Sequence, residues 1–209
     1  MREVVLVRCE LHPASGAGHL KRCSVLISAL QKEGLSAVII LDENSGPLPI
    51  DLSVPIERIS ARLYDEASDI EDIADLALRY HARKVVGDSY RITQGWVKGL
   101  QEKGLSVILI DDLEVGEFAD LAIDYSPAAL GRSALSNRLA GPSYFITDSM
   151  PVVSNNITPR KIILHAGGTG NFAAAPHVYS AAVVLARERG LHLNWICPTP
   201  QSHAWVTSS

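Results

Sequence analysis

The sequence predicts an α/β protein built on a doubly wound parallel sheet. Three observations support this fold class: short apolar runs alternate with segments of helical periodicity, the runs are rich in valine, isoleucine and leucine, and glycines end several of the helical segments. Strands that are apolar on both faces are typical of parallel sheets covered by helices. Repeated strand–helix units with right-handed crossovers give this architecture.

The elements of the first part of the chain follow in order. Strands are expected at 3–8, 35–41, 56–59, 84–87, 106–110, 121–123 and 144–147. Helices are expected from Leu20 to the glycine at 34, over 65–80, and from the N-cap Thr93 to Lys103. The segment 42–55 is rich in proline, glycine and aspartate and is interpreted as a loop.

A second copy of the pattern begins after a break. Residues 150–160 hold two prolines and a Ser-Asn-Asn run, which predicts a linker. We therefore expect a Rossmann-like domain at 1–149 and an incomplete second one at 161–209, with strands at 161–165 and 191–197 around a helix at 176–189. A two-stranded unit is marginal alone. Three arrangements stay open: it packs on the first domain, pairs with a second chain, or is completed by a missing C-terminal half.

Composition limits the classes of function. The 209 residues are 47% hydrophobic and 20% charged, with a net charge of −4, which argues against a nucleic-acid or anionic-membrane partner. Three cysteines without a CxxC pair predict reduced thiols rather than a zinc site. Charges interrupt the N-terminal apolar run, and no run approaches the roughly 20 residues of a membrane span. We expect a cytoplasmic protein.

The chemistry centres on the stretch Gly16-Ala17-Gly18-His19, which follows the first strand. Glycines let the backbone turn tightly and approach a ligand. The amides and the positive dipole end of the next helix favour an anion there. His19 can exchange a proton near neutral pH, so the stretch predicts an anion-binding turn that carries a candidate general base.

Polar groups follow other strands as well. In an open parallel sheet, ligands bind at the carboxyl ends of the strands. The residues expected at those ends are Glu10, Asp88, Ser89, Tyr90, Asp111, Asp112, His165, Gly167, Gly168 and Thr169. Acid, base and phosphate-binding groups are therefore expected to converge on one crevice.

Each of these groups also has a structural interpretation. Glycine turns after strands commonly serve only packing, and Lys21 stands where a dinucleotide fingerprint has its third glycine. Asp111 and Asp112 fit the capping of the next segment equally well. Tyr90 fits a packed aromatic side chain with its hydroxyl at the surface. The pattern alone indicates a nucleotide- or phosphate-binding protein whose reaction is open.

The order of the motifs resembles one family. The motifs are Arg8-x-Glu10, Gly16-x-Gly18-His19-x-x-Arg22, Asp88-Ser89-Tyr90, Ile110-Asp111-Asp112, Gly141-Pro142-Ser143-Tyr144 and Gly167-Gly168-Thr169. In this order they resemble the UDP-sugar hydrolases of pseudaminic acid biosynthesis, the PseG family, and the related spore-coat polysaccharide protein SpsG. The resemblance runs from residue 2 to about residue 172.

The resemblance implies the two-domain GT-B fold and the hydrolysis of UDP-2,4-diacetamido-2,4,6-trideoxy-β-L-altropyranose. The anomeric C–O bond breaks with inversion and releases UDP. The implied catalytic residues are His19 and Tyr90. The implied substrate-binding residues are Arg8, Glu10, Gly16, Gly18, Arg22, Asp88, Asp111 and Asp112, and the implied nucleotide-binding residues are Gly167, Gly168 and Thr169. The partner is a UDP-sugar, and no cofactor or metal is expected.

Two departures from the family pattern keep other functions open. Gly170 stands where the family has an acidic residue, and Glu10 stands where aspartate is usual. The alternatives are a GT-B glycosyltransferase, in which a sugar hydroxyl replaces water, and a non-catalytic protein that binds a sugar nucleotide or a partner.

Overall fold

The computed structural model describes residues 2–12, 17–48, 50–60, 65–110, 115–131, 136–147, 161–165 and 175–196. These residues belong to two compact units, one formed by the ranges up to 147 and the other by the ranges from 161 onward. The predicted boundaries at 149 and 160 stay predictions, because 148–160 lie outside the described residues.

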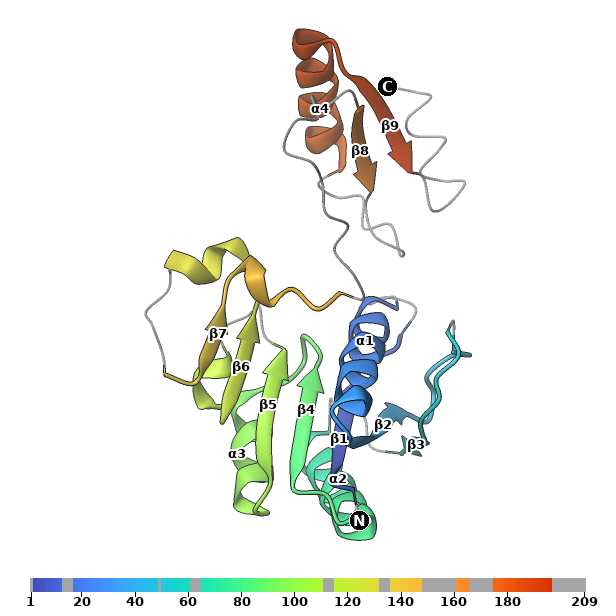
Figure 1. Cartoon of the computed structure of the whole chain (residues 1–209), viewed down its shortest axis with the longest axis vertical. Coiled ribbons are helices and arrows are strands. Elements are labelled where there is room, and N and C mark those ends of the chain that lie inside the picture. Colours follow the sequence, from blue (N-terminus) through green and yellow to red (C-terminus); the bar gives the residue numbers. More distant parts are fainter. Residues whose placement is uncertain are drawn as a thin grey trace. The chain divides into compact units, whose positions relative to one another are not determined.

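The first unit contains a seven-stranded parallel sheet in the order β3-β2-β1-β4-β5-β6-β7 (Figure 1). Its strands are β1 (Val4–Cys9), β2 (Ser36–Asp42), β3 (Ile56–Ile59), β4 (Lys84–Asp88), β5 (Ser106–Ile110), β6 (Leu121–Asp124) and β7 (Arg138–Ala140). The chain builds outward from β1 to β3 and then restarts at β4 on the other side of β1. Such a reversal of strand order opens a crevice at the carboxyl ends of the two central strands.

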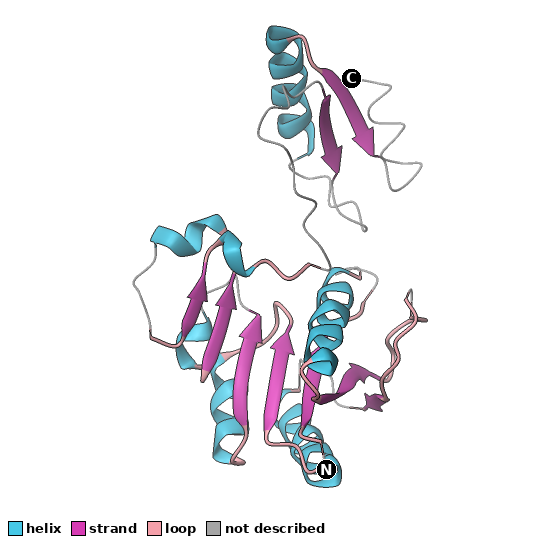
Figure 2. Ribbon diagram, in the orientation of Figure 1, coloured by secondary structure: helices cyan, strands magenta, loops and turns pink. Residues whose placement is uncertain are grey.

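Helices cover both faces of this sheet. Figure 2 shows α1 (Gly18–Lys32) on one face and α2 (Glu66–Tyr80) and α3 (Gln94–Glu102) on the other. The predicted N-cap Thr93 is confirmed, because its hydroxyl accepts a hydrogen bond from the Trp96 amide at 3.1 Å. The predicted glycine stop of α1 is confirmed too: Gly34 has φ +81°, a conformation that costs glycine little.

The side chains of β1 point alternately into two apolar cores, one on each face of the sheet. Val5, Val7 and Cys9 pack under α1, whereas Leu6 packs under α2 and α3. Burying each of the valine and leucine side chains contributes about 1.5–3 kcal/mol relative to exposure. Arg8 follows the same alternation and therefore faces the α2 and α3 layer, where charged groups are expensive to bury.

One predicted strand is wrong. Residues 144–147 are not a strand; the edge strand is instead Arg138–Ala140, which pairs with β6. Gly141 has φ +97° and is followed by a short 3-10 helix at Pro142–Tyr144, so the extended chain ends before the predicted strand begins. Phe145 is also 54% exposed, which a buried strand would not allow.

The second unit is a parallel strand–helix–strand unit, as predicted. It consists of β8 (Lys161–His165), α4 (Ala175–Arg189) and β9 (His192–Ile196), and the two strands pair in parallel. Ala182 and Ala186 are buried positions of α4. The predicted glycine turn at 166–170 lies outside the described residues.

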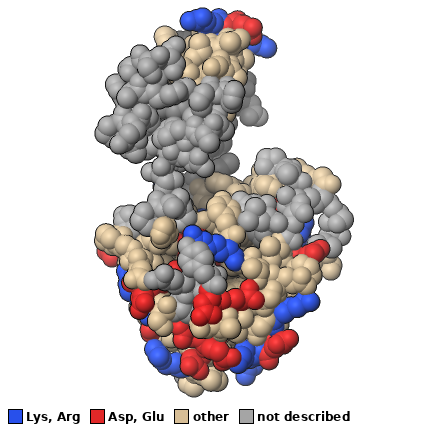
Figure 3. Space-filling view, turned by 180° about the vertical axis from the view of Figure 1, so that it is seen from behind, with Lys and Arg blue, Asp and Glu red and all other residues tan. Residues whose placement is uncertain are grey.

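Charged side chains of both signs lie on one face of the first unit. On the face seen in Figure 3, lysine and arginine side chains are interspersed with aspartate and glutamate side chains. This mixture matches a chain with 19 basic and 23 acidic residues.

Candidate functional site

The candidate site begins at the carboxyl ends of β1 and β4, where the strand order reverses. Cys9 and Asp88 end these two strands and lie side by side in the parallel register. The Asp88 side chain lies on the α1 face of β4, because Val86, two residues earlier, belongs to the core under α1. A buried carboxylate therefore faces the first turn of α1.

Two side chains of α1 bind that carboxylate. His19 and Arg22 are three residues apart, which places them on one face of the helix. The Nδ1 atom of His19 lies 2.8 Å from Asp88 Oδ1, and Arg22 Nε donates to Asp88 Oδ2 at 2.6 Å. Arg22 Nη2 also donates to Asp88 Oδ1, so the guanidinium binds the carboxylate with two nitrogens.

The charges of this cluster set the ionisation of Asp88. Burial alone would raise the pKa of Asp88, but hydrogen bonds from Arg22 and His19 outweigh it and hold this pKa below its usual range. Burial likewise acts against the Arg22 charge, and Asp88 overcomes it, so the pKa of Arg22 is raised. Asp88 is therefore a fixed anion against which His19 can be oriented.

This ionisation predicts an acid dependence of stability. Because the pKa of Asp88 is lower in the folded protein than in the unfolded chain, the unfolded chain takes up the proton first as pH falls. The contribution of Asp88 to the free energy of unfolding is thus complete above about pH 5 and is lost on further acidification. Urea unfolding of Asp88→Asn between about pH 5 and pH 2.5 should show a shallower pH slope than wild type. Asp75→Asn removes an exposed carboxylate of α2 and is the matched control; a wild-type slope in Asp88→Asn would contradict the assignment.

The predicted catalytic tyrosine lies against the histidine. The Tyr90 ring meets the His19 imidazole edge-on, with centroids 4.8 Å apart and planes at 78°. Tyr90 is 53% exposed, whereas His19 is 4% exposed. The phenol therefore covers an enclosed imidazole and presents its other side to solvent.

Glu10 forms a neighbouring polar group. It is 3% exposed, accepts a hydrogen bond from the Ser89 hydroxyl at 2.6 Å, and lies 3.5 Å from Arg91 Nη2. The Glu10 amide also donates to the Asp88 carbonyl at 3.3 Å. The structure thus brings together His19, Arg22, Asp88, Tyr90 and Glu10, all of which the sequence singled out.

Arg8 lies apart from this group. Its side chain has no exposed surface, and its Nε and Nη2 donate to Asp69 of α2 at 3.0 and 2.7 Å. It also binds Asp42 at the end of β2, while the Trp96 indole donates to Asp69 at 2.8 Å. Arg8 therefore ties β1 to α2, and its predicted part in substrate binding stays a prediction.

The remaining predicted site residues are divided by what the structure describes. Gly18 is the first residue of α1, and nothing lies within 4 Å of the position a Cβ would take. The others lie outside the described residues: Gly16, Asp111, Asp112, Gly167, Gly168 and Thr169.

Sequence reasoning missed two members of the cluster. Tyr125 directly follows β6 and accepts a hydrogen bond from Arg22 Nη1, and applying the carboxyl-end rule to the predicted strand at 121–123 would have found it. Cys23 donates its Sγ–H to Asp88 Oδ2 at 3.4 Å. Its hydrogen bond with Cys9, its burial and the nearby Asp88 carboxylate all raise the pKa of Cys23, and no sequence signal marked it.

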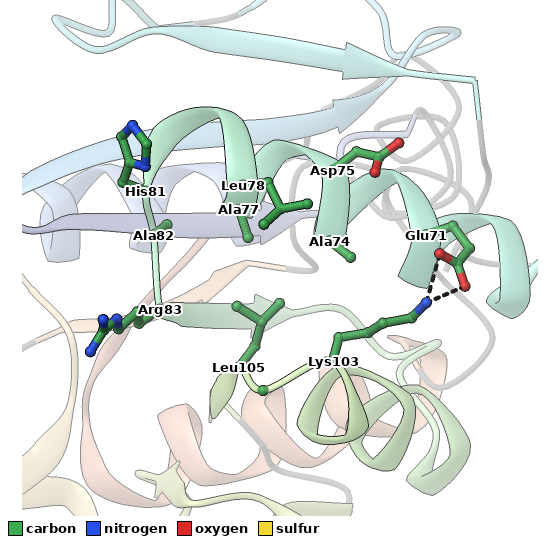
Figure 4. Close-up of a pocket in the computed structure, with 11 residues that line it drawn as sticks. Glu71, Ala74, Asp75, Ala77, Leu78, His81, Ala82, Arg83, Lys103 and Leu105 are labelled. Carbon is green, nitrogen blue, oxygen red and sulfur yellow. Dashed lines mark hydrogen bonds and ion pairs between the residues drawn. The ribbon is translucent and has the colours of Figure 1, made fainter.

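A separate hollow of about 480 Å³ lies between the C-terminal ends of α2 and α3 (Figure 4). Arg83 and Leu105, which line it, precede β4 and β5, so the hollow is at the amino-terminal edge of the sheet, opposite His19. Lys103 spans its rim and donates to Glu71 at 2.6 and 2.8 Å. The hollow is not part of the His19 cluster.

Two further properties concern the described ranges only. No group of three or more His, Cys, Asp or Glu side chains there is arranged to hold a metal ion. None of the helices in those ranges combines the length and the apolar character needed to cross a bilayer.

A parallel sheet with a central reversal, followed by a second parallel strand–helix–strand unit, defines an α/β protein with the Rossmann-like layout of the GT-B fold. The chain is similar to MurG from Acinetobacter baumannii, with a TM-score of 0.59 and 14% identity over 99% of this chain and 71% of that one. It is also similar to MnaA from S. aureus, described as a UDP co-structure, with a TM-score of 0.54 and 13% identity over 100% of this chain and 66% of that one.

A glycosyltransferase from Rickettsia africae gives a TM-score of 0.53 with 11% identity, over 95% of this chain and 69% of that one. The chain therefore spans about two thirds of the length of these structures. At these identities the likeness shows the fold. No family model matches the chain, and no curated protein matches it.

Proposed function

We propose that the protein hydrolyses a UDP-linked diacetamido-trideoxy sugar at its anomeric C–O bond, giving UDP and the free sugar. The observation that carries the proposal is the contact between His19 Nδ1 and Asp88 Oδ1 at 2.8 Å. An imidazole that donates from Nδ1 to a carboxylate presents an unprotonated Nε2, which can act as a base. The GxGHxxR and DSY motifs shared with the PseG family supply the substrate class.

Water, His19 and the leaving UDP account for every proton and bond in the proposed step. Water gives its proton to His19 Nε2, and its oxygen attacks the anomeric carbon from the face opposite UDP. The anomeric C–O bond breaks, UDP leaves with the bonding electron pair, and the configuration inverts. The Asp88 carboxylate stabilises the imidazolium that forms, because the two groups are already in hydrogen-bond contact. A pathway to pseudaminic acid or to a surface polysaccharide would use the free sugar.

Two of the similar structures support a nucleotide-sugar substrate. MnaA is described with UDP, and the Rickettsia africae protein is described as a glycosyltransferase. The second of these favours the alternative reaction, in which the same base activates a sugar hydroxyl instead of water. For either reaction, the residues proposed to bind the nucleotide are Gly167, Gly168 and Thr169, which lie outside the described ranges.

A release assay in labelled water tests the proposal. The purified protein is incubated with UDP-2,4-diacetamido-2,4,6-trideoxy-β-L-altropyranose in ¹⁸O-water, and UDP is measured with a coupled nucleotidase. Release without any acceptor, with ¹⁸O in the sugar and none in UDP, is the expected result. Release that requires an added sugar acceptor would select the transferase. Binding of UDP with no release under either condition would select a non-catalytic protein.

A further inference from the structure

Tyr125 brings a hydroxyl from the far part of the sheet to the His19 cluster. It follows β6, which β5 separates from β4, yet its hydroxyl accepts a hydrogen bond from Arg22 Nη1. The Phe145 ring packs edge-on against the Tyr125 ring, with centroids 5.1 Å apart and planes at 88°. The guanidinium of Arg22 also lies over the Tyr125 ring, at 5.7 Å from its centroid. The position of the phenol is therefore set by packing as well as by its hydrogen bond.

The Arg22 guanidinium is held at all three nitrogens. Its Nε and Nη2 donate to the two carboxylate oxygens of Asp88, a two-nitrogen contact called the Asp88 fork below, and its Nη1 donates to Tyr125. Because a guanidinium is planar and rigid, the Tyr125 contact fixes how far the group can turn about the Asp88 fork. Tyr125 thereby controls where the second N–H of Nη2 points.

The second N–H of Arg22 Nη2 and the Asp88 carboxylate compete for the Nδ1 atom of His19. Arg22 Nη2 lies 3.0 Å from His19 Nδ1, and Asp88 Oδ1 lies 2.8 Å from the same nitrogen. Nδ1 can donate to Asp88 only when it carries the proton, and it can accept from Arg22 only when it does not. The two contacts thus belong to opposite tautomers of His19, and only the first leaves Nε2 as a base.

We propose that Tyr125 selects the tautomer of His19 by restraining Arg22. With the phenol hydroxyl in place, Nη1 is held on Tyr125 and Nη2 on Asp88, so the 3.0 Å approach of Nη2 to Nδ1 is a close contact without a donated proton, and His19 donates from Nδ1 to Asp88. Without the hydroxyl, the guanidinium pivots, Nη2 donates to Nδ1, and the proton moves to Nε2. Tyr125 is a positioning residue in this scheme, and its effect on turnover rests on the proposed function.

The tautomer can be read without any substrate. In protein labelled with ¹⁵N-histidine at about pH 8, where neutral imidazoles predominate, the ¹⁵N shifts distinguish protonated from bare ring nitrogens. The His19 signals are assigned as those missing in His19→Asn. Wild type should show the Nδ1–H tautomer, and Tyr125→Phe should show a major Nε2–H population. Arg22→Lys, which lacks the fork, provides a second variant and should also disturb the Nδ1–H tautomer.

Tyr144→Phe is the matched control, because it removes the hydroxyl of a 43% exposed tyrosine at the end of the neighbouring 3-10 helix. It should keep the wild-type tautomer. An Nε2–H tautomer in wild type, or an unchanged Nδ1–H tautomer in Tyr125→Phe, would overturn the proposal. If wild type releases UDP, Tyr125→Phe should lower kcat by about tenfold with KM unchanged, the size expected for one charge-assisted hydrogen bond. Absence of UDP release by wild type would defeat the proposed function but leave the tautomer result standing.

Discussion

His19→Asn is expected to lower the turnover of the UDP-sugar by at least about two orders of magnitude, with a smaller change in KM. A positioned general base contributes about 10²–10⁴-fold, and asparagine cannot take the proton from water. The asparagine amide still reaches toward Asp88, so the Arg22–Asp88 pair should survive and the protein should fold. Steady-state kinetics with the same substrate, together with circular dichroism of both proteins, check this expectation.

His81→Asn is the control for that experiment. His81 lies at the end of α2, at the opposite edge of the sheet, and has φ 51°. Asparagine tolerates this left-handed conformation better than most residues, so the substitution removes an imidazole with little strain. His81→Asn should keep the wild-type turnover. Equal turnover in His19→Asn and wild type would remove His19 from the mechanism.

Arg8→Met is expected to lower the free energy of unfolding by about 3–5 kcal/mol, the usual cost of breaking a buried ion pair from one side. Methionine fills much of the same space, so the loss arises mainly from the carboxylates left behind. Asp69 has no exposed surface and, among the described side chains, would keep the Trp96 indole as a donor. The neighbouring Asp42 would lose its arginine as well. Urea unfolding at neutral pH measures the change.

Two comparisons separate the buried charge from lost packing. Lys84→Met breaks an exposed pair with Glu3, in which both side chains are nearly half exposed, and should cost less than about 1 kcal/mol. Arg8→Met combined with Asp69→Asn removes one uncompensated carboxylate and should recover part of the loss. A loss in Arg8→Met as small as that in Lys84→Met would show that the Arg8 network contributes little to stability.

The fold could be predicted largely because its signals are local. Apolar runs bounded by glycine and polar turns marked β1, β4 and β5 closely, and Thr93 marked the start of α3. The edge strand was missed because Arg138-Leu139-Ala140 is short and only partly buried, so it has no apolar pattern of its own. The exposed aromatic residues at 144–145 imitated that pattern instead.

The site residues that lie at strand ends could be predicted from the sequence, whereas the side-chain pairs that they form could be predicted only in part. Carboxyl-end logic placed Asp88 and Tyr90 near His19 because parallel strands end at one edge. The family resemblance also grouped Arg8 with them, although the two-residue alternation of β1 turns that side chain to the other face. Its partner Asp69 lies 61 positions away, and in the sequence it is one of two acidic residues in the first turn of a helix. Such a long-range pair has no signature in a single sequence.

Two buried thiols, Cys9 and Cys23, lie beside the His19 cluster, and their chemical labelling can report when the cluster opens. Cys9 and Cys23 have no exposed surface, and the raised pKa of Cys23 keeps it as the unreactive thiol. An alkylating reagent can therefore reach Cys23 only after α1 has separated from β4, which also separates His19 and Arg22 from Asp88. The rate at which Cys23 is modified in native buffer measures the free energy of that opening, and a ligand that closes the crevice should slow it.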